Sequence, residues 1–340
     1  MRFSALGDVA LILPVLNTVL HHYPGLEIVI ATRGPFAPLF SKLHRTVLVT
    51  ADFKQSHRGL CGLIRLYRQL INAGPFDAVL DLHGVVRSHL LRFFFRIAGT
   101  AVYRINKERT ARSALTRRRN KVLRPLSSAQ ERYRKVFDEA GYPVSAILPY
   151  VFMPGDKAST MSRNMLYGYP QPFRIGIAPF ASYPLKEWGM DKMTALCHAL
   201  SQQYDAMFVF FGFGDRELSL LRKLRDESGI KAIICDGVDI ELQLSLLRSL
   251  HCLICMDSSN LHLGQLAAIP VVSVWGPTHP YAGFAPQGEN ANRVAAVSSL
   301  HLNCRPCSIY GNKACFRHDH ACMKMLRVET VMEMARKVLS

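Results

Sequence analysis

Short runs of Val, Ile, Leu and Phe alternate with helix-like segments along almost the whole chain, and this order limits the fold more than any other feature. In the first half the apolar runs lie at residues 27–32, 46–53, 76–84 and 101–106. They show no strict polar–apolar alternation, which is typical of strands that are covered on both faces of a sheet. The strand–helix–strand order predicts an α/β fold with parallel strands joined by right-handed crossovers.

A second alternating series starts at residue 173. Its predicted strands are 173–181, 205–214, 231–237, 251–257 and 270–277. A chain of 340 residues exceeds the usual size of one core, so we expect two domains. They are an N-terminal domain at 1–150 and a C-terminal domain at 173–326, joined by a Pro- and Gly-containing linker at 151–172. The closing amphipathic helix, within 327–340, could pack back on the N-terminal domain.

The chain is strongly basic, with 42 Lys and Arg against 25 Asp and Glu and a formal net charge of +17. Such an excess favours anionic partners, namely nucleic acid, anionic lipid or phosphorylated substrates. Residues 106–125 hold eight basic residues and one acid. We interpret this segment as a surface for a polyanion, with a solvated loop as the alternative. Residues 85–99 mix three arginines with three consecutive phenylalanines. Core packing is our interpretation there, and docking on an anionic membrane is the alternative.

No apolar run reaches the roughly 18 residues of a membrane span, and the N-terminus lacks the pattern of a signal peptide. We therefore expect the protein in the cytoplasm, where a peripheral contact with an anionic membrane stays an alternative.

The nine cysteines fall into two groups. Five occur singly in strand-like or helical segments and are interpreted as small buried apolar residues: Cys61, Cys197, Cys235, Cys252 and Cys255. The other four cluster near the end of the chain: Cys304, Cys307, Cys315 and Cys322. Their spacing permits a structural zinc site, but we favour packed thiols and predict no metal.

The stretch 254–280 carries the clearest candidate site. A strand ends at Asp257, and Ser258, Ser259 and Asn260 are good N-cap residues for the helix that follows. The free N–H groups at that helix start suit an anion such as a diphosphate, and His262 on the first turn can reach the same ligand. Helix capping alone would also explain the serines.

The N-terminal turn, residues 4–8, raises a similar pair of alternatives. An apolar helix at 9–20 follows it, while almost nothing precedes it. Gly7 permits a close turn, and Asp8 is either the N-cap of the helix or a carboxylate that points toward a ligand.

Four segments in order resemble the signature motifs of glycosyltransferase family 9, the ADP-heptose:lipopolysaccharide heptosyltransferases. They are "RFSALGDVALILPVL" near the start, "DLHGVVRS" at 81–88, "DSSNLHLGQLAAIPVVSVWGPTHP" at 257–280 and the cysteine-bearing "RPCSIYGNKACFRHDHACMKML" at 305–326. The third segment departs from the family pattern because Ser259 stands where glycine is usual. Family members usually carry several apolar residues, which form the central first strand, before the first motif. Either the start codon lies further upstream, which we favour, or the protein tolerates a shortened first strand.

The resemblance implies a GT-B fold: two Rossmann-like domains, with parallel sheets, that face a central cleft. The first domain would hold the acceptor and the second the nucleotide sugar. It also implies an inverting transfer that requires no metal and no cofactor. Displacement at an anomeric carbon needs a base for the incoming hydroxyl and a stabiliser for the departing diphosphate.

The resemblance also implies roles for single residues. Asp8 would be the general base, and Lys186, in a Lys-x-Trp setting, would bind the diphosphate. Other donor-binding residues would be Ser182, Glu217, Asp257, Ser258, Ser259, Asn260 and His262. Acceptor-binding residues would be Gly7, Arg87, Arg117 and Arg118.

We thus expect transfer of heptose from an ADP-sugar to an anionic lipopolysaccharide-type acceptor, with no nucleic-acid partner. The alternatives are a family 9 transferase with another nucleotide sugar or acceptor, and a non-catalytic protein that binds polyanions.

Overall fold

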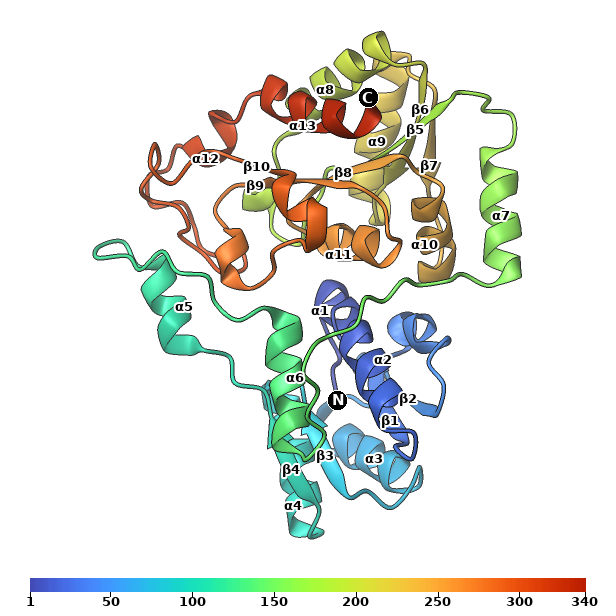
Figure 1. Cartoon of the computed structure of the whole chain (residues 1–340), viewed down its shortest axis with the longest axis vertical. Coiled ribbons are helices and arrows are strands. Elements are labelled where there is room, and N and C mark those ends of the chain that lie inside the picture. The colour runs from blue at the N-terminus through green and yellow to red at the C-terminus, as the bar shows by residue number, and fades with distance from the viewer. The chain divides into compact units, whose positions relative to one another are not determined.

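The computed structural model describes residues 1–340, and the chain divides into two compact units (Figure 1). Unit 1 comprises Met1–Glu108 and Ser127–Tyr150, and unit 2 comprises Arg109–Leu126 and Val151–Ser340. The segment Arg109–Leu126, which the sequence placed in the N-terminal domain, therefore belongs to unit 2. No helix is long and apolar enough to cross a membrane.

Unit 1 contains two separate pairs of parallel strands. β1 (Ile28–Arg33) pairs with β2 (Thr46–Ala51), and β3 (Ala78–Asp81) pairs with β4 (Ala101–Arg104). The first three residues lie extended between β1 and β3. The Arg2 N–H donates to the Ala31 carbonyl at 3.0 Å, and the Leu82 N–H donates to the Met1 carbonyl at 3.1 Å. Met1–Phe3 thus bridges the two pairs by backbone hydrogen bonds.

A cavity of about 170 Å³ lies next to Met1 and Arg2 and is lined by residues of β1 and β3. Its lining is mostly apolar and includes Ile28–Ala31 and Ala78–Leu80. The Met1 ammonium donates to the Leu80 carbonyl at 2.7 Å beside this cavity, and burial lowers its pKa to about 6.

The predicted helix at 9–20 is two helices, α1 (Leu6–Ala10) and α2 (Leu13–His22), with a proline in the first turn of α2. The other long helices of unit 1 are α3 (Gly59–Ile71), α4 (Val86–Ile97) and α6 (Ala129–Glu139). Residues Gly34–Phe40 form a 3₁₀ helix.

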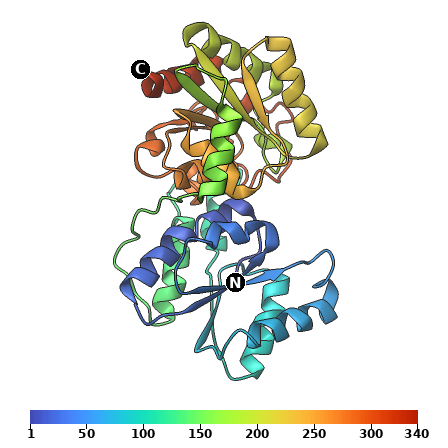
Figure 2. The same ribbon diagram turned by 90° about the vertical axis from the view of Figure 1, so that its right-hand side faces the viewer.

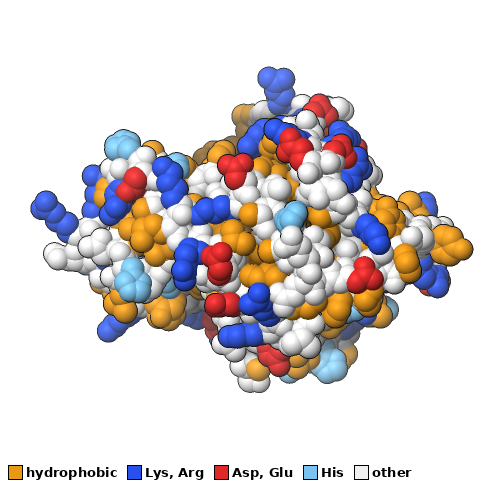
Figure 3. Space-filling model, turned by 90° about the horizontal axis from the view of Figure 1, so that it is seen from above, with side chains coloured by type: hydrophobic (Ala, Val, Ile, Leu, Met, Phe, Trp, Pro, Cys, Tyr) orange, Lys and Arg blue, Asp and Glu red, His pale blue; other side chains and the backbone are white.

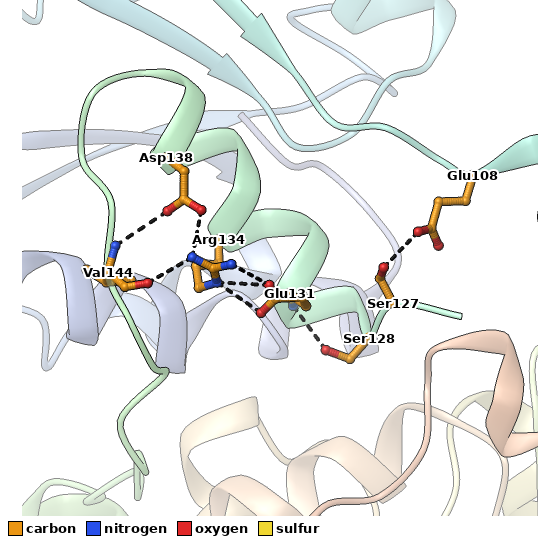
Figure 4. A network of polar contacts seen from close by, with 7 residues as sticks. All are labelled: Glu108, Ser127, Ser128, Glu131, Arg134, Asp138 and Val144. Carbon is orange, nitrogen blue, oxygen red and sulfur yellow. Dashed lines mark hydrogen bonds and ion pairs between the residues drawn. The ribbon is translucent and has the colours of Figure 1, made fainter. Parts of the chain in front are cut away.

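Helix α6 begins where the chain returns to unit 1, and polar contacts fix that point (Figure 4). The Ser128 side chain caps the helix by accepting from the Glu131 N–H at 3.0 Å. Within the helix, Arg134 bonds to Glu131 and to Asp138, and it donates to the Val144 carbonyl at 2.8 Å. These bonds tie the helix to the segment that leaves unit 1.

Unit 2 is built on one parallel sheet with the strand order β10-β9-β8-β5-β6-β7. Its strands are β5 (Phe173–Ala178), β6 (Ala206–Phe211), β7 (Ala232–Cys235), β8 (Cys252–Met256), β9 (Val271–Trp275) and β10 (Val294–Ala296). Every residue of β6, β8 and β9 is buried, as the continuous apolar runs predict. From β5 the chain continues to β6 and β7 on one side, and it then crosses to β8 on the other side of β5. The topological switch point therefore lies between β5 and β8, and α/β sheets bind ligands at such a point.

The helices of unit 2 are α5 (Arg109–Thr116), α7 (Asp156–Leu166), α8 (Met190–Gln203), α9 (Gly214–Ser228), α10 (Ile240–Arg248), α11 (Ser259–Leu266), α12 (Ala321–Lys324) and α13 (Val328–Leu339). The linker expected at 151–172 contains α7, which packs on α10 through a 2.7 Å bond between the Ser162 and Ser245 hydroxyls. Helix α13 packs on α8, β8 and β9 of its own unit, and its packing on the N-terminal domain stays a prediction.

The basic segment Arg109–Leu126 is held to unit 2 by directed bonds. Lys121 Nζ donates to the carbonyls of Asn303, Cys304 and Pro306 at 2.7–3.2 Å. The Leu126 N–H donates to the Tyr281 carbonyl at 2.9 Å. On the face seen in Figure 3, Lys and Arg are scattered with Asp and Glu between them.

Candidate functional site

Three loops of unit 2 meet at the switch point of its sheet. Asp257 follows β8 and is buried, and its carboxylate accepts from the Thr278 hydroxyl at 2.7 Å, in the loop after β9. Lys186 comes from the loop after β5, where its Nζ lies 3.2 Å from Asp257 Oδ2 and also bonds to the Asp257 carbonyl. The structure thus brings Lys186 and Asp257 together with Thr278, which lies in the quoted segment 257–280 but to which the sequence analysis assigned no role.

Helix α11 starts directly beside this ion pair. Ser258 is its N-cap residue, yet its side chain makes no capping bond, and its buried hydroxyl has no hydrogen-bond partner. Ser259 and Asn260 form the first turn, where Asn260 Oδ1 accepts from Gln243 at 2.7 Å, and His262 is buried on the same helix. Free N–H groups at the start of the helix, next to a lysine ammonium, make a site that favours an anion.

A buried arginine supports the loop after β9 from within. Arg305 is 1% exposed, and its Nε donates to the Gly276 carbonyl at 2.6 Å. Its other nitrogens bond to the carbonyls of Trp275, Thr278 and Val297. Burial lowers the pKa of this guanidinium. The sequence analysis assigned no role to Arg305, because its position beneath the loop after β9 depends on the fold.

Two other predicted donor residues lie apart from the ion pair. Ser182 is exposed in the loop after β5. Glu217 accepts from the Phe213 N–H at 2.8 Å at the start of α9, and burial raises the pKa of its carboxyl. Glu217 therefore holds its own loop, and its contact with a ribose stays a prediction.

The four clustered cysteines line one small cavity of about 20 Å³ together with Arg305. All nine cysteines are free thiols. Burial raises the pKa of Cys304, Cys307 and Cys322, the last to about 11. No group of three or more His, Cys, Asp or Glu side chains is arranged to hold a metal ion.

Unit 1 presents the second predicted cluster, around Asp8. Asp8 is the third residue of α1 and not its N-cap, which is Ala5. Its carboxylate lies 2.5 Å from an Arg2 nitrogen and 3.4 Å from the Ala5 N–H, with one fifth of the side chain exposed. Gly7 is buried in the same short helix. Asp8 thus both stabilises the helix start and remains accessible.

His83 joins this cluster, although sequence reasoning did not select it. Its Nε2 lies 3.2 Å from the Ser4 hydroxyl, and burial, with Arg2 nearby, lowers its pKa to about 3, so the imidazole is neutral. Below it, the fully buried Asp81 accepts from the N–H groups of His83 and Gly84, each at 2.9 Å. The motif "DLHG" is the sequence signal that could have found His83, because it places the ring two residues after a buried carboxylate.

The predicted acceptor residues are divided between the units. Arg87 is exposed on α4 of unit 1, with its guanidinium 4.7 Å from the Phe53 ring centre. Arg117 and Arg118 are exposed after α5 and belong to unit 2, where Arg118 lies over Phe316 at 4.4 Å.

Residues 63–315 match the family model described as glycosyltransferase family 9 (heptosyltransferase). The sequence is 29% identical over 168 residues to lipooligosaccharide heptosyltransferase 2 of Campylobacter jejuni, a match that covers 48% of this chain and 50% of that protein. The chain thus spans about half the length of the curated relatives it matches.

Solved structures share the fold over nearly the whole chain. A family 9 glycosyl transferase from Veillonella parvula aligns with a TM-score of 0.79 at 18% identity, covering 99% of this chain and 95% of that one. The E. coli heptosyltransferase WaaC with ADP-2-deoxy-2-fluoro heptose aligns with a TM-score of 0.68 at 18% identity, covering 99% and 98%. E. coli ADP-heptose lps heptosyltransferase II aligns with a TM-score of 0.70 at 16% identity, covering 100% and 98%. These likenesses establish the GT-B fold.

Proposed function

The chain belongs to glycosyltransferase family 9, the heptosyltransferase family, and from this premise we propose that it transfers heptose from ADP-heptose to an inner-core lipopolysaccharide acceptor. The observation that carries the proposal is the anion site at the switch point of unit 2, where Lys186 and Asp257 meet the start of α11. The similarity to proteins named lipooligosaccharide heptosyltransferase 2, and to a WaaC structure with an ADP-heptose analogue, supports the choice of donor.

The donor diphosphate would lie against the first turn of α11 and the Lys186 ammonium. An ammonium has three N–H donors, and both bonds described for Lys186 go to Asp257, so a phosphate oxygen can accept a third. The unpartnered Ser258 hydroxyl offers one more donor. The backbone of Ser259, with Asn260 and His262 on the same helix, would complete the diphosphate site, and Ser182 and Glu217 would contact the donor further out. These groups stabilise the negative charge that develops on the leaving diphosphate.

Asp257 would contact hydroxyls of the donor sugar through whichever oxygen is not engaged by Thr278 and Lys186. Both of the bonds described for its side chain reach Oδ2, which leaves Oδ1 as an acceptor. The ion pair therefore orients the Asp257 carboxylate, and a hydroxyl of the donor sugar would donate a hydrogen bond to Oδ1.

Asp8 would act as the general base for the acceptor hydroxyl in an inverting displacement. Arg2 and the Ala5 N–H hold its carboxylate in one orientation and leave part of it exposed. The nearby His83 imidazole is neutral, so it adds no positive charge that would compete with the acceptor hydroxyl for Asp8. A base needs this combination of fixed geometry and access.

The acceptor side would rely on Gly7, Arg87, Arg117 and Arg118, because an inner-core acceptor carries carboxylates and phosphates that arginine binds well. The protein would work at the cytoplasmic face of the inner membrane, with a peripheral contact there. The transfer would require no cofactor beyond the ADP-sugar, and metal independence is part of the proposal.

The test replaces Asp8 with asparagine and measures heptose transfer together with ADP binding. We expect Asp8→Asn to abolish turnover and to leave the Kd for ADP within about twofold, since no donor contact is removed. The matched control is Asp191→Asn, in the first turn of α8, which should leave both unchanged. Near-normal turnover of Asp8→Asn contradicts its role as base. A thermal shift produced by UDP or GDP, but not by ADP, contradicts the donor and favours a family 9 transferase with another nucleotide sugar.

A further inference from the structure

Helix α4 exposes a continuous apolar stripe. Four large side chains on it are accessible to solvent: Val86 (75%), Leu90 (36%), Phe93 (57%) and Ile97 (71%). With 3.6 residues per turn, positions 86, 90, 93 and 97 fall within an arc of about 60° on the helix. A stripe of this size on one helix face marks a surface that binds something apolar.

The opposite face of α4 packs on the core of unit 1. The exposed stripe is therefore not the core-facing side of this helix. Leu91 and Phe95 are buried in the apolar core of unit 1. Arg92 lies 3.0 Å from the fully buried Asp81. The helix is therefore fixed on the body of unit 1 by one face and presents the other outward. The core-packing interpretation of 85–99 holds for Phe95 and is wrong for Phe93.

The charged side chains of α4 and of the neighbouring helix α3 are all basic, while the exposed acids Asp52 and Asp77 lie in the segments before α3 and β3. On the helix, Arg87 lies to one side of the stripe and Arg96 to the other, and α4 contains no acid. Helix α3 lies beside α4 (Figure 2), exposes Arg65 and Arg68 and contains no acid. β4 ends in the exposed Arg104. An apolar stripe with arginines on both sides is the pattern of a helix that lies in a membrane interface.

We propose that α4 docks on an anionic lipid surface. Val86, Leu90, Phe93 and Ile97 enter the boundary between headgroups and acyl chains, while Arg87 and Arg96 bond to lipid phosphates at the level of the headgroups. The net charge of +17 adds a longer-range attraction to the same surface. Arg87, which is also proposed to bind the acceptor, would here bond to lipid as well, and the docking is measured without sugar transfer.

The experiment measures binding of the full chain to vesicles by co-sedimentation. Vesicles of phosphatidylcholine with 30–40% phosphatidylglycerol, roughly the anionic fraction of a bacterial membrane surface, are compared with vesicles of phosphatidylcholine alone. We expect at least about tenfold tighter binding to the anionic vesicles and a marked loss at high salt. The variant Phe93→Gln/Ile97→Gln should lose about tenfold or more, because two large side chains no longer enter the lipid. Arg96→Gln should weaken binding to the anionic vesicles only.

Two controls separate docking from other causes. Leu300→Gln, at a side chain 93% exposed in unit 2, and Lys223→Gln, at one 67% exposed, should bind vesicles as the unchanged protein does. Thermal unfolding of each variant verifies that the fold is kept. Equal vesicle binding by Phe93→Gln/Ile97→Gln and the unchanged protein overturns the proposal, as does absence of binding to anionic vesicles. A dimer that becomes a monomer in Phe93→Gln/Ile97→Gln, without lipid, also overturns it and assigns the stripe to self-association.

Discussion

Replacing Lys186 with methionine tests the anion site of unit 2 most directly. Methionine keeps most of the length of the side chain and removes the three N–H donors. A charge-assisted hydrogen bond contributes about 1.5–3 kcal/mol, so loss of one bond to the diphosphate should weaken ADP binding by about ten- to a hundredfold. The variant also leaves Asp257 with Thr278 as its side-chain partner, and we expect a loss of about 1–3 kcal/mol in the free energy of unfolding.

Calorimetric titration with ADP, AMP and adenosine separates these two effects. Adenosine carries no phosphate, so its Kd should change less than about twofold, while the Kd for ADP rises steeply. Lys223→Met is the matched control, because Lys223 is 67% exposed on α9 and pairs only with Glu227 at 3.7 Å. If Lys186→Met weakens adenosine and ADP equally, or leaves ADP binding unchanged, Lys186 does not bind phosphate and the reasoning fails.

Four further changes test other parts of the structure. A Cβ at Gly311, where φ is +80°, would lie 2.4 Å from Lys186 Cγ, so Gly311→Ala should weaken ADP binding, whereas Gly237→Ala, at φ +66° with open space around it, should cost stability alone. Because the folded pKa of His83 is about 3 and lies below its usual 6.5, the unfolded chain takes up the proton first as pH falls. The free energy of unfolding should then fall below pH 6.5 by up to about 1.4 kcal/mol per pH unit, and urea titrations at pH 7 and 5 should show a smaller drop in His83→Gln than in the unchanged protein. Arg305→Met removes a donor from four carbonyl groups and should lower the free energy of unfolding by about 3 kcal/mol or more, measured by urea; a loss under 1 kcal/mol would speak against its role under the loop. A Val-Val-Ile-Leu extension ahead of Met1 should continue the backbone of Met1–Phe3 between β1 and β3 and raise Tm, while Gly-Ser-Gly-Ser should not; equal Tm values contradict this prediction.

The sheet of unit 2 follows from the sequence because its strands are buried on both faces. Continuous apolar runs marked β5, β6, β7, β8 and β9 to within a few residues of their observed ends. β10 has three residues, too short for any periodic signal. The predicted helix at 9–20 contains a turn before α2, where Pro14 sits in the first turn and removes a backbone donor.

The site was predictable only as far as it depends on local patterns. Asp257 and the serines after it stand at a strand–helix junction, which the sequence marks with cap residues. Arg305 and Thr278 acquire their roles through contacts across the fold, which no local pattern reports. Arg117 and Arg118 were assigned to the wrong unit, because chain order does not reveal that Arg109–Leu126 packs with later residues.

The way the chain passes between the units has a consequence for engineering. Because unit 2 takes Arg109–Leu126 from within the sequence of unit 1, three peptide connections join the units, after Glu108, Leu126 and Tyr150. A fragment that starts at Val151 would lack Lys121, and the carbonyls of Asn303, Cys304 and Pro306 would lose the ammonium that binds them. Unit 2 is therefore not a block that can be excised or exchanged between homologues at a single junction. A chimera must transfer Arg109–Leu126 together with Val151–Ser340, and a single protease cut in any one connection will not separate the halves.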